Sequence, residues 1–394
     1  MSVQPTIPRR ILPIIVLAQF AGTSLWFAGN AVLPDLQTDL GLPPNAVGSV
    51  TSAVQLGFIL GTLVFAFFSL ADRISPSRLF WCCAWLGALA NLGVFLADGL
   101  NGLLFFRACT GFFLAGIYPV GMKIASDWFS GKLGSALGWL VGALVLGTAF
   151  PHGLRSLTAG LPWEAVMIGT SAVAALGGLV IGVFVPDGPN RKAASQFKPT
   201  VLFTMFKVPE FRAAAFGYFG HMWELYTFWA FVPILVAQAL AGEGSVSGAS
   251  FGIIAIGALG CIIGGYRALQ RGSHRVAATM LVVSGLCCLV SPLLPQLPGW
   301  VQLAILVVWG YAVVGDSPQF STLAARTAPS ESVGTALTIM NSLGFAITIF
   351  SLQALSAARL AYPEATWHYL LLLPGPVLGL LALRPLLRAG GGQG

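Results

Sequence analysis

The sequence predicts an all-α membrane protein in which twelve transmembrane helices form two six-helix halves related by a pseudo-two-fold axis. The first observation is composition: 56% of the 394 residues are hydrophobic and only 8% are charged, whereas soluble domains carry about 25% charged residues. The second is that the apolar residues gather in runs long enough to cross a hydrocarbon core of about 30 Å as helices. The third is a polar, basic stretch in mid-chain that divides these runs into two sets.

Apolar runs account for the predicted helices one by one. They lie at residues 11–33, 46–68, 79–97, 103–125, 133–152, 164–185, 211–239, 249–266, 276–294, 300–324, 333–357 and 367–387. Their spacing predicts an N-terminal half at residues 1–185, a linker at residues 186–209 and a C-terminal half at residues 210–394. The linker combines Pro, Asp, Gly and Asn with basic residues, so we expect it to lie outside the bilayer.

The Lys and Arg residues predict the orientation. Of the 20 in the chain, only Arg155 and Arg359 fall in loops on one side and Arg107 falls within a span. Because Lys and Arg are enriched in cytoplasmic loops, we expect both termini and the linker in the cytoplasm and the protein in a bacterial inner (plasma) membrane. The net charge of +7 is scattered over short loops, which argues against nucleic acid as a partner. We expect the lipid bilayer as its surroundings and a monomer.

The sequence carries no signature of an enzyme. All six cysteines lie in apolar runs without a C-x-x-C pattern, so we interpret them as small core residues rather than metal ligands or disulfides. No P-loop, H-E-x-x-H or nucleophile-elbow pattern occurs. We therefore predict no catalytic residue, no metal and no cofactor, and an ion gradient as the energy source.

One span carries ionisable groups near its middle. Glu224 lies there, His221 lies one helical turn before it, and Trp223 and Tyr226 flank it. A charged side chain at the centre of a membrane helix costs about 2.5–3.5 kcal/mol on insertion scales, so Glu224 should face a cavity or a partner. A substrate or proton site is one interpretation, and a structural hydrogen bond between helices is the other.

A weak repeat relates the two halves. An offset of 197 residues places Trp26 on Trp223, and an offset of 199 places Pro119 on Pro318. Pro318 follows Asp316 within the tenth span, where a proline can break the helix and free backbone groups. Arg107 in the fourth span and Asp316 in the tenth therefore add two charges to that of Glu224 inside the membrane.

The loop after the second span resembles the signature loop of the major facilitator superfamily, Gly-x-Leu-Ala-Asp-Arg-x-Gly-Arg-Arg. Leu70–Arg73 match that pattern, whereas Phe68 and Ser75 stand where glycines are usual. The second-half copy of the loop has Leu269 in place of the Asp. The resemblance implies a gate in which the Asp approaches the start of the eleventh helix when the cytoplasmic side closes, and a solvated loop acid is the alternative. The residues assigned to the gate are Asp72, Arg73 and Arg78.

Other elements extend the resemblance over nearly the whole chain. Arg107 and Gly111 resemble an Arg-x-x-x-Gly element that this family links to proton coupling, although Arg107 near the end of its span could instead snorkel to the outer surface. The end of the fourth span is similar to cyanate and nitrate porters of the family. Glycines four apart, as at Gly57/Gly61 and Gly260/Gly264, allow close helix approach. In this family they are expected where the halves slide, and ordinary packing is the alternative.

The resemblance implies a secondary transporter that works by alternating access, with the first, fourth, seventh and tenth helices lining a central cavity. We expect a small organic ion or zwitterion as the substrate, held by Arg107 and one acid between aromatic walls, and H⁺ as the coupling ion through Glu224 and Asp316. The predicted substrate and proton site comprises Arg107, Glu224, Asp316, His221, Trp26, Asn30, Trp223, Tyr226 and Gln319.

Two alternatives stay open at this point, with a membrane enzyme as a weaker third. The aromatic residues would also suit an amphipathic drug, which would make the protein a multidrug efflux pump of the same fold. The degraded second loop would suit a sensor or assembly protein that does not transport, because fold alone does not determine function. The sequence leaves the substrate, the direction of transport and the use of symport, antiport or uniport undetermined.

Overall fold

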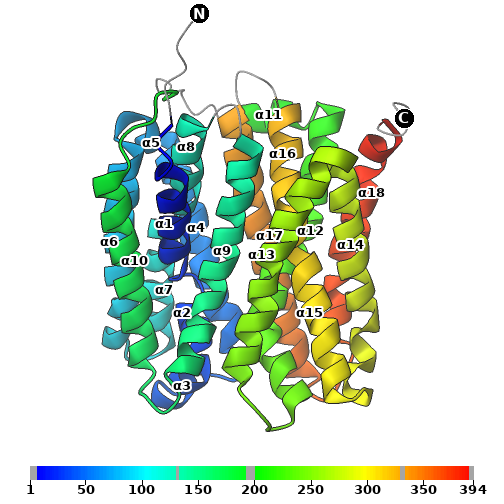
Figure 1. Cartoon of the computed structure of the whole chain (residues 1–394). Helices are drawn as coiled ribbons and strands as arrows, with labels where there is room; N and C mark the ends of the chain where they lie inside the picture. Colours follow the sequence, from blue (N-terminus) through cyan, green and yellow to red (C-terminus); the bar gives the residue numbers. More distant parts are fainter. Residues whose placement is uncertain (1–6, 130–132, 192–199, 329–332, 390–394) are drawn as a thin grey trace, which may run out of the picture.

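A computed structural model describes residues 7–129, 133–191, 200–328 and 333–389 of the chain. All regular secondary structure of these residues is helical. The start of α1 and the end of α18 lie at the same end of the bundle (Figure 1), which we call the terminal face, and the other end is the opposite face. Residues 192–199 of the predicted linker and the outermost residues of both termini lie outside the described residues.

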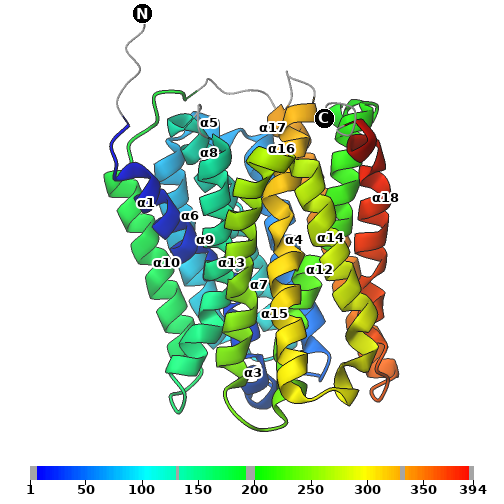
Figure 2. The ribbon, with the colours of Figure 1, turned by 45° about the vertical axis from the view of Figure 1, so that its right-hand side comes forward.

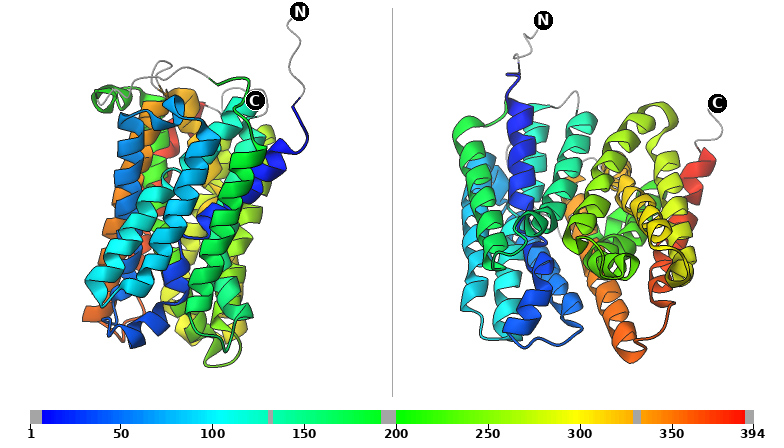
Figure 3. Two further views of the ribbon diagram at one scale, coloured as in Figure 1. Left: turned by 90° about the vertical axis from the view of Figure 1, so that its left-hand side faces the viewer. Right: turned by 60° about the horizontal axis from the view of Figure 1, so that its bottom comes forward.

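The N-terminal half forms one side of the molecule and the C-terminal half the other, as Figure 1 and the view with the opposite face brought forward in Figure 3 show. The first half consists of α1 (Ile11–Thr23), α2 (Ala28–Ala31), α3 (Leu33–Asp39), α4 (Ala46–Phe67), α5 (Leu70–Arg73), α6 (Pro76–Leu92), η1 (Gly93–Leu96), α7 (Leu100–Leu114), α8 (Tyr118–Trp128), α9 (Leu133–Leu157) and α10 (Glu164–Phe184). The short α11 (Val201–Met205) follows at the terminal face. The second half consists of α12 (Pro209–Leu240), α13 (Val246–Arg271), α14 (Ser273–Val290), η3 (Ser291–Gln296), α15 (Gly299–Gly315), α16 (Ser317–Thr327), α17 (Val333–Ala361), η4 (His368–Leu372) and α18 (Pro374–Ala389).

Eleven helical stretches of the described residues are long and apolar enough to cross a membrane, and α1 adds a shorter apolar helix. The predicted twelve-helix architecture is therefore confirmed. Large apolar side chains such as Phe105, Phe350 and Leu378 remain exposed on the bundle. A hydrocarbon environment explains this exposure, because lipid tails are as apolar as these side chains.

Three predicted spans are interrupted near their middle. The first breaks between Thr23 and Ala28, the fourth between Leu114 and Tyr118, and the tenth at Asp316. Pro119 and Pro318 lie in the first turns of α8 and α16, where a residue without an N–H group is tolerated. Two of the breaks thus fall at the positions that the sequence repeat relates.

The two halves meet along two pairs of helices. α9 packs along α13 (Figure 2), and α4 packs along α17. Near the opposite face the Nε2 of Gln353 donates a hydrogen bond of 2.9 Å to the Oγ of Ser52. At the ends of α9 and α13, the hydroxyl oxygens of Ser156 and Ser245 lie 3.0 Å apart. The halves are therefore in contact at the opposite face.

The paired glycines do not form this contact. A Cβ atom added at Gly57 would lie 1.9 Å from the carbonyl oxygen of Ala108 on α7, and one at Gly260 would lie 2.3 Å from that of Tyr311 on α15. Both partners belong to the same half as the glycine. The expectation that these glycines line the sliding surface is wrong for these positions, because they let neighbouring helices of one half approach each other closely.

Candidate functional site

Six aromatic side chains form a continuous cluster between the two halves, which we call the inter-half aromatic cluster. Its members are Trp26, Phe27 and Phe58 from the first half and Tyr226, Trp229 and Phe345 from the second. The ring centroids of Trp26 and Tyr226 lie 5.5 Å apart, those of Trp26 and Phe345 lie 5.6 Å apart, and both pairs are stacked at 25°. Trp26 and Tyr226 are thus brought together, as the sequence predicted for the walls of one site.

The break in the first span places Trp26 in this cluster. The guanidinium of Arg107 donates to the carbonyl oxygens of Leu25 at 3.1 Å and Trp26 at 2.6 Å, and to the Oδ1 of Asn91 at 2.8 Å. A carbonyl inside a regular helix already accepts a bond from the N–H four residues on. Arg107 supplies donors to two carbonyls that the interruption frees. Its side chain is completely buried, which excludes snorkelling in this structure.

Glu224 is satisfied within the second half. Its carboxylate accepts hydrogen bonds from the Nε1 of Trp309 at 2.6 Å, the Oγ of Ser284 at 2.9 Å and the Sγ of Cys288 at 3.3 Å. These donors lie on α14 and α15, so the carboxylate points into its own helix bundle. Glu224 and Arg107 therefore have separate partners, and the structure does not bring them together.

His221 and Asp316 form a buried pair at the break of the tenth span. The Nδ1 of His221 lies 2.7 Å from the Oδ1 of Asp316, and both side chains are almost completely buried. The Nε2 of His221 has no hydrogen-bond partner among the described residues. The sequence placed His221 and Glu224 on one face, and the structure gives them different partners.

The remaining predicted site residues do not converge on the cluster. The Nε1 of Trp223 donates to the carbonyl of Leu371 at 2.8 Å, so this ring is anchored inside the second half. Asn30 donates to the hydroxyl of Thr51 at 2.7 Å. Gln319 is buried on α16, beside Gly264 of α13.

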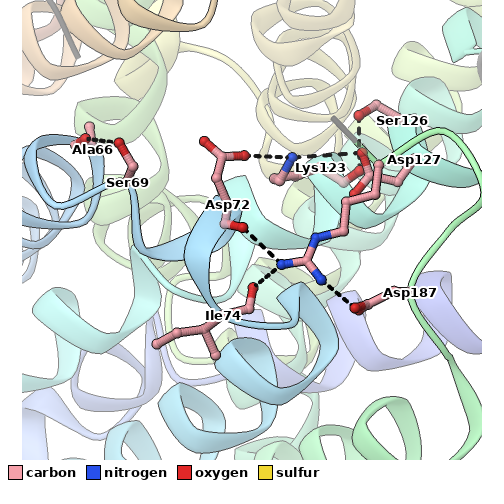
Figure 4. A network of polar contacts seen from close by, with 9 residues as sticks. Ala66, Ser69, Asp72, Ile74, Lys123, Ser126, Asp127 and Asp187 are labelled. Atoms are coloured by element: carbon pink, nitrogen blue, oxygen red, sulfur yellow. Dashed lines mark hydrogen bonds and ion pairs between the residues drawn. The ribbon is translucent and has the colours of Figure 1, made fainter. Parts of the chain in front are cut away.

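Of the predicted gate residues, Asp72 belongs to a polar network at the terminal face, shown in Figure 4. The Nζ of Lys123 lies 2.9 Å from the carboxylate of Asp72 and 3.7 Å from that of Asp127. Arg191, from the start of the linker, donates to the carbonyl of Asp72 at 2.8 Å and pairs with Asp187. In this structure the carboxylate of Asp72 therefore has a partner in its own half. Arg73 and Arg78 are exposed beside it.

The predicted site lacks four members of the cluster, Phe27, Phe58, Trp229 and Phe345, and several partners of the charges. Phe27, Phe58 and Phe345 lie in apolar runs that contain many other phenylalanines, so no local signal sets them apart. Asn91 and Arg191 are polar residues whose partners are distant in sequence. A search for polar residues inside spans would have found Asn91.

A family model described as Major Facilitator Superfamily matches residues 15–352, and the chain belongs to this family. Part of the chain is 27% identical over 179 residues to the human synaptic vesicle glycoprotein 2C, a match that covers 42% of this chain and 24% of that protein. The chain thus matches about a quarter of the length of this relative.

Solved transporter structures share the fold. A bacterial homologue of the human lysosomal transporter Spinster, in an inward-facing and unoccupied conformation, aligns with a TM-score of 0.68 at 15% identity over 96% of this chain and 97% of that one. The nucleoside transporter NupG gives 0.70 at 14% identity over 96% and 99%. The human organic anion transporter MFSD10 gives 0.71 at 16% identity over 95% and 98%. Family and fold place the chain among transporters rather than enzymes.

Proposed function

We propose that this member of the major facilitator superfamily is a secondary transporter that carries a small organic molecule between its two halves by alternating access. The inter-half aromatic cluster is the observation that carries the proposal. Its rings come equally from both halves, so any separation of the halves at mid-height separates these rings. A substrate that binds there contacts both halves and can therefore respond to, and bias, their relative position.

The contacts of the buried charges bear on the kind of substrate. A small organic ion or zwitterion held by Arg107 and an acid would have to displace the partners that these residues already have. Aromatic rings remain as the surface shared between the halves. This favours the organic, amphipathic substrates of our alternative over a small ion.

We assign H⁺ coupling to the pair formed by His221 and Asp316. The main polar contact of each of these two side chains is with the other. Glu224, in contrast, accepts three hydrogen bonds, which stabilise it as a structural carboxylate. The other titratable groups around the pair are Tyr218 and Glu224 on α12 and Cys261 on α13. Burial away from water disfavours a lone charge, so a proton gained or lost by this pair changes the energy of the break that Asp316 occupies.

The orientation and boundaries follow as part of the same proposal. The terminal face carries most of the Lys and Arg residues, so we place it in the cytoplasm of a bacterial cell with the membrane around a monomer. The halves then correspond to residues 1–185 and 210–394, with residues 186–209 as the connection between them.

Distances between spin labels test alternating access without a known substrate. One pair, at Leu157 and Glu243, reports on the opposite face, and the other, at Ile74 and Arg326, reports on the terminal face. All four residues are exposed. The labels are placed in protein whose Cys82 and Cys109 are replaced by serine, reconstituted in liposomes.

We expect two populations of distances for each pair of labels. A change of pH or an added solute should lengthen the distance at one face and shorten the distance at the other. A single, invariant distance at both faces under all pH values and added solutes would contradict transport. It would favour a sensor or an assembly protein.

A further inference from the structure

We propose that the substrate is an uncharged, flat aromatic molecule with hydrogen-bond acceptors on its edge, bound within the inter-half aromatic cluster. This inference rests on the proposed function, because it names the molecule that the two halves exchange. It follows from the geometry of the rings, from the polar atoms beside them and from the charges that are already engaged.

The rings across the interface are arranged for stacking. Trp26 lies nearly parallel to both Tyr226 and Phe345, and Phe27 is stacked against Tyr226 at 6.4 Å. Opening the halves at either face pulls these rings apart and exposes both surfaces. A flat aromatic ligand restores an aromatic partner on each side, whereas a saturated ligand of the same size does not.

Polar groups in and beside the cluster lack partners. The indole N–H groups of Trp26 and Trp229 are buried without an acceptor among the described residues, and both polar atoms of the Gln55 amide are equally unpartnered. Gln55 precedes Phe58 by three residues on α4, so the two side chains lie on one face of the helix. An indole N–H only donates. Two such donors therefore select acceptor atoms on the ligand, and Gln55 supplies either type of bond.

The charged groups argue against a charged ligand. Among the described residues of the spans, Glu224 accepts three hydrogen bonds inside the second half and Asp316 lies 2.7 Å from the Nδ1 of His221, so both carboxylates have their contacts outside the cluster rather than among its rings. An anion finds the two terminal nitrogens of Arg107 already bonded to Asn91 and to two carbonyls, and the Nε, which has no hydrogen-bond partner among the described residues, lies against the backbone of Gly29. A charge transferred from water to the rings of the cluster would therefore lose hydration without direct contact with a free charged group.

Matched probes test this inference with the purified full-length protein. The one-ring set is nicotinamide, its N-methylated cation, nicotinate as the anion and cyclohexanecarboxamide as the saturated neutral analogue. The two-ring set is quinoline-3-carboxamide, its N-methylated cation, quinoline-3-carboxylate and decahydronaphthalene-2-carboxamide. Binding is measured by the rise in unfolding temperature and by quenching of tryptophan fluorescence.

We expect a neutral aromatic amide to bind at least about tenfold more tightly than its charged or saturated counterparts, a difference that corresponds to about 1.4 kcal/mol. Equal or tighter binding of a cation, an anion or a saturated amide would overturn the inference. So would the absence of binding by both neutral aromatic amides.

Variants locate the binding site. Trp26→Phe keeps a ring and removes the N–H group, and Gln55→Met keeps the length and removes the amide, so each should weaken binding several-fold. Trp81→Phe is the control, because Trp81 lies on α6 and is 40% exposed on the bundle. The unfolding temperature of each variant without ligand shows whether it is folded. Equal affinity in all three folded variants would place the probes outside the cluster and contradict the inference.

The spin-label distances separate this inference from the proposed function. If the distances alternate and the neutral aromatic amides do not bind, the transport function stands and the substrate class is wrong. If these amides bind in the cluster and the distances never change, the ligand class stands for a sensor and transport is wrong.

Discussion

Each half of the molecule buries a charged side chain in its interior, Arg107 in the first half and Glu224 in the second, and the two are hydrogen-bonded in different ways. In the first half Arg107 is satisfied by two backbone carbonyls and Asn91. In the second half Glu224 is satisfied by three side chains. The offset of 197 residues that aligns the halves places Asn91 on Cys288, so equivalent positions on α6 and α14 contact the two opposite charges.

The difference follows from backbone chemistry. A carbonyl oxygen has two lone pairs, so an interrupted helix offers acceptors to a cation. A backbone N–H has one hydrogen, which a continuous helix consumes, so a carboxylate inside a bundle depends on side-chain donors. The buried Arg107 therefore lies beside a broken first span, and this break carries Trp26 into the interface. The anion coincides with an unbroken α12 surrounded by donors from neighbouring helices.

The largest expected effect concerns the response to protons in the second half. Asp316→Asn cannot exchange a proton at this position, so the spin-label distances at both faces should lose their dependence on pH. Glu224→Gln is the matched control, because it also replaces a buried carboxylate on the same half, and it should keep that dependence. Pulsed electron paramagnetic resonance across a series of pH values measures both. The reverse result, a response lost in Glu224→Gln and kept in Asp316→Asn, would restore Glu224 as the coupling residue.

The next largest effect concerns the charge of the first half. Arg107→Met should lower stability by about 3 kcal/mol or more, because it leaves three buried oxygen acceptors without this donor, at about 1–3 kcal/mol for each unsatisfied group. Arg107→Lys keeps the charge but loses the forked geometry, so its loss should be intermediate. Thermal unfolding in detergent measures both variants. A stability of Arg107→Met close to that of the unmodified protein would show that the broken helix does not depend on this clamp.

A smaller loss is expected for the anion of the second half. Glu224→Ala leaves the indole N–H of Trp309 without its acceptor and the hydroxyl of Ser284 with only the carbonyl of Leu281 at 3.4 Å, at a cost of about 1–3 kcal/mol. Glu224→Gln keeps one carbonyl oxygen in place and should cost less. The emission wavelength of Trp309, isolated by comparison with Trp309→Phe, should shift in the alanine variant. If Glu224→Ala were more destabilising than Arg107→Met, the contrast between the two halves would be reversed.

The smallest stability effect belongs to the terminal face. The pair of Asp72 and Lys123 is partly exposed, so Asp72→Asn should cost less than about 1 kcal/mol. As a gate, Asp72 would stabilise the closed terminal face, so the variant should shift the distribution of distances between labels at Ile74 and Arg326 toward its longer population. Glu243→Gln is the control, because Glu243 lies on the opposite face. It is made in protein that carries labels only at the terminal face. An unchanged distribution in Asp72→Asn would remove the gate role.

Much of the fold could be predicted because span length and apolarity are properties of short segments. The interruptions were harder. The prolines at 119 and 318 indicate two of them, but the break before Ala28 has no proline, and Arg107, which bonds to the carbonyl of Trp26 there, is 81 residues away along the chain. Predicting that break requires knowing which helix lies beside which.

The sequence by itself determined the membrane class, the two sets of six helices and the presence of ionisable residues on the fourth, seventh and tenth spans. It could do so because burial in lipid constrains composition residue by residue. Only the tertiary structure decided how those charges are used. In the structure Arg107 bonds to carbonyls of the first span, Glu224 accepts a hydrogen bond from Trp309, and Asp316 lies beside His221. Aromatic rings occupy the interface of the halves. A hydrogen bond requires two groups within about 3 Å, and distances between separate helices are not encoded in any single stretch of sequence.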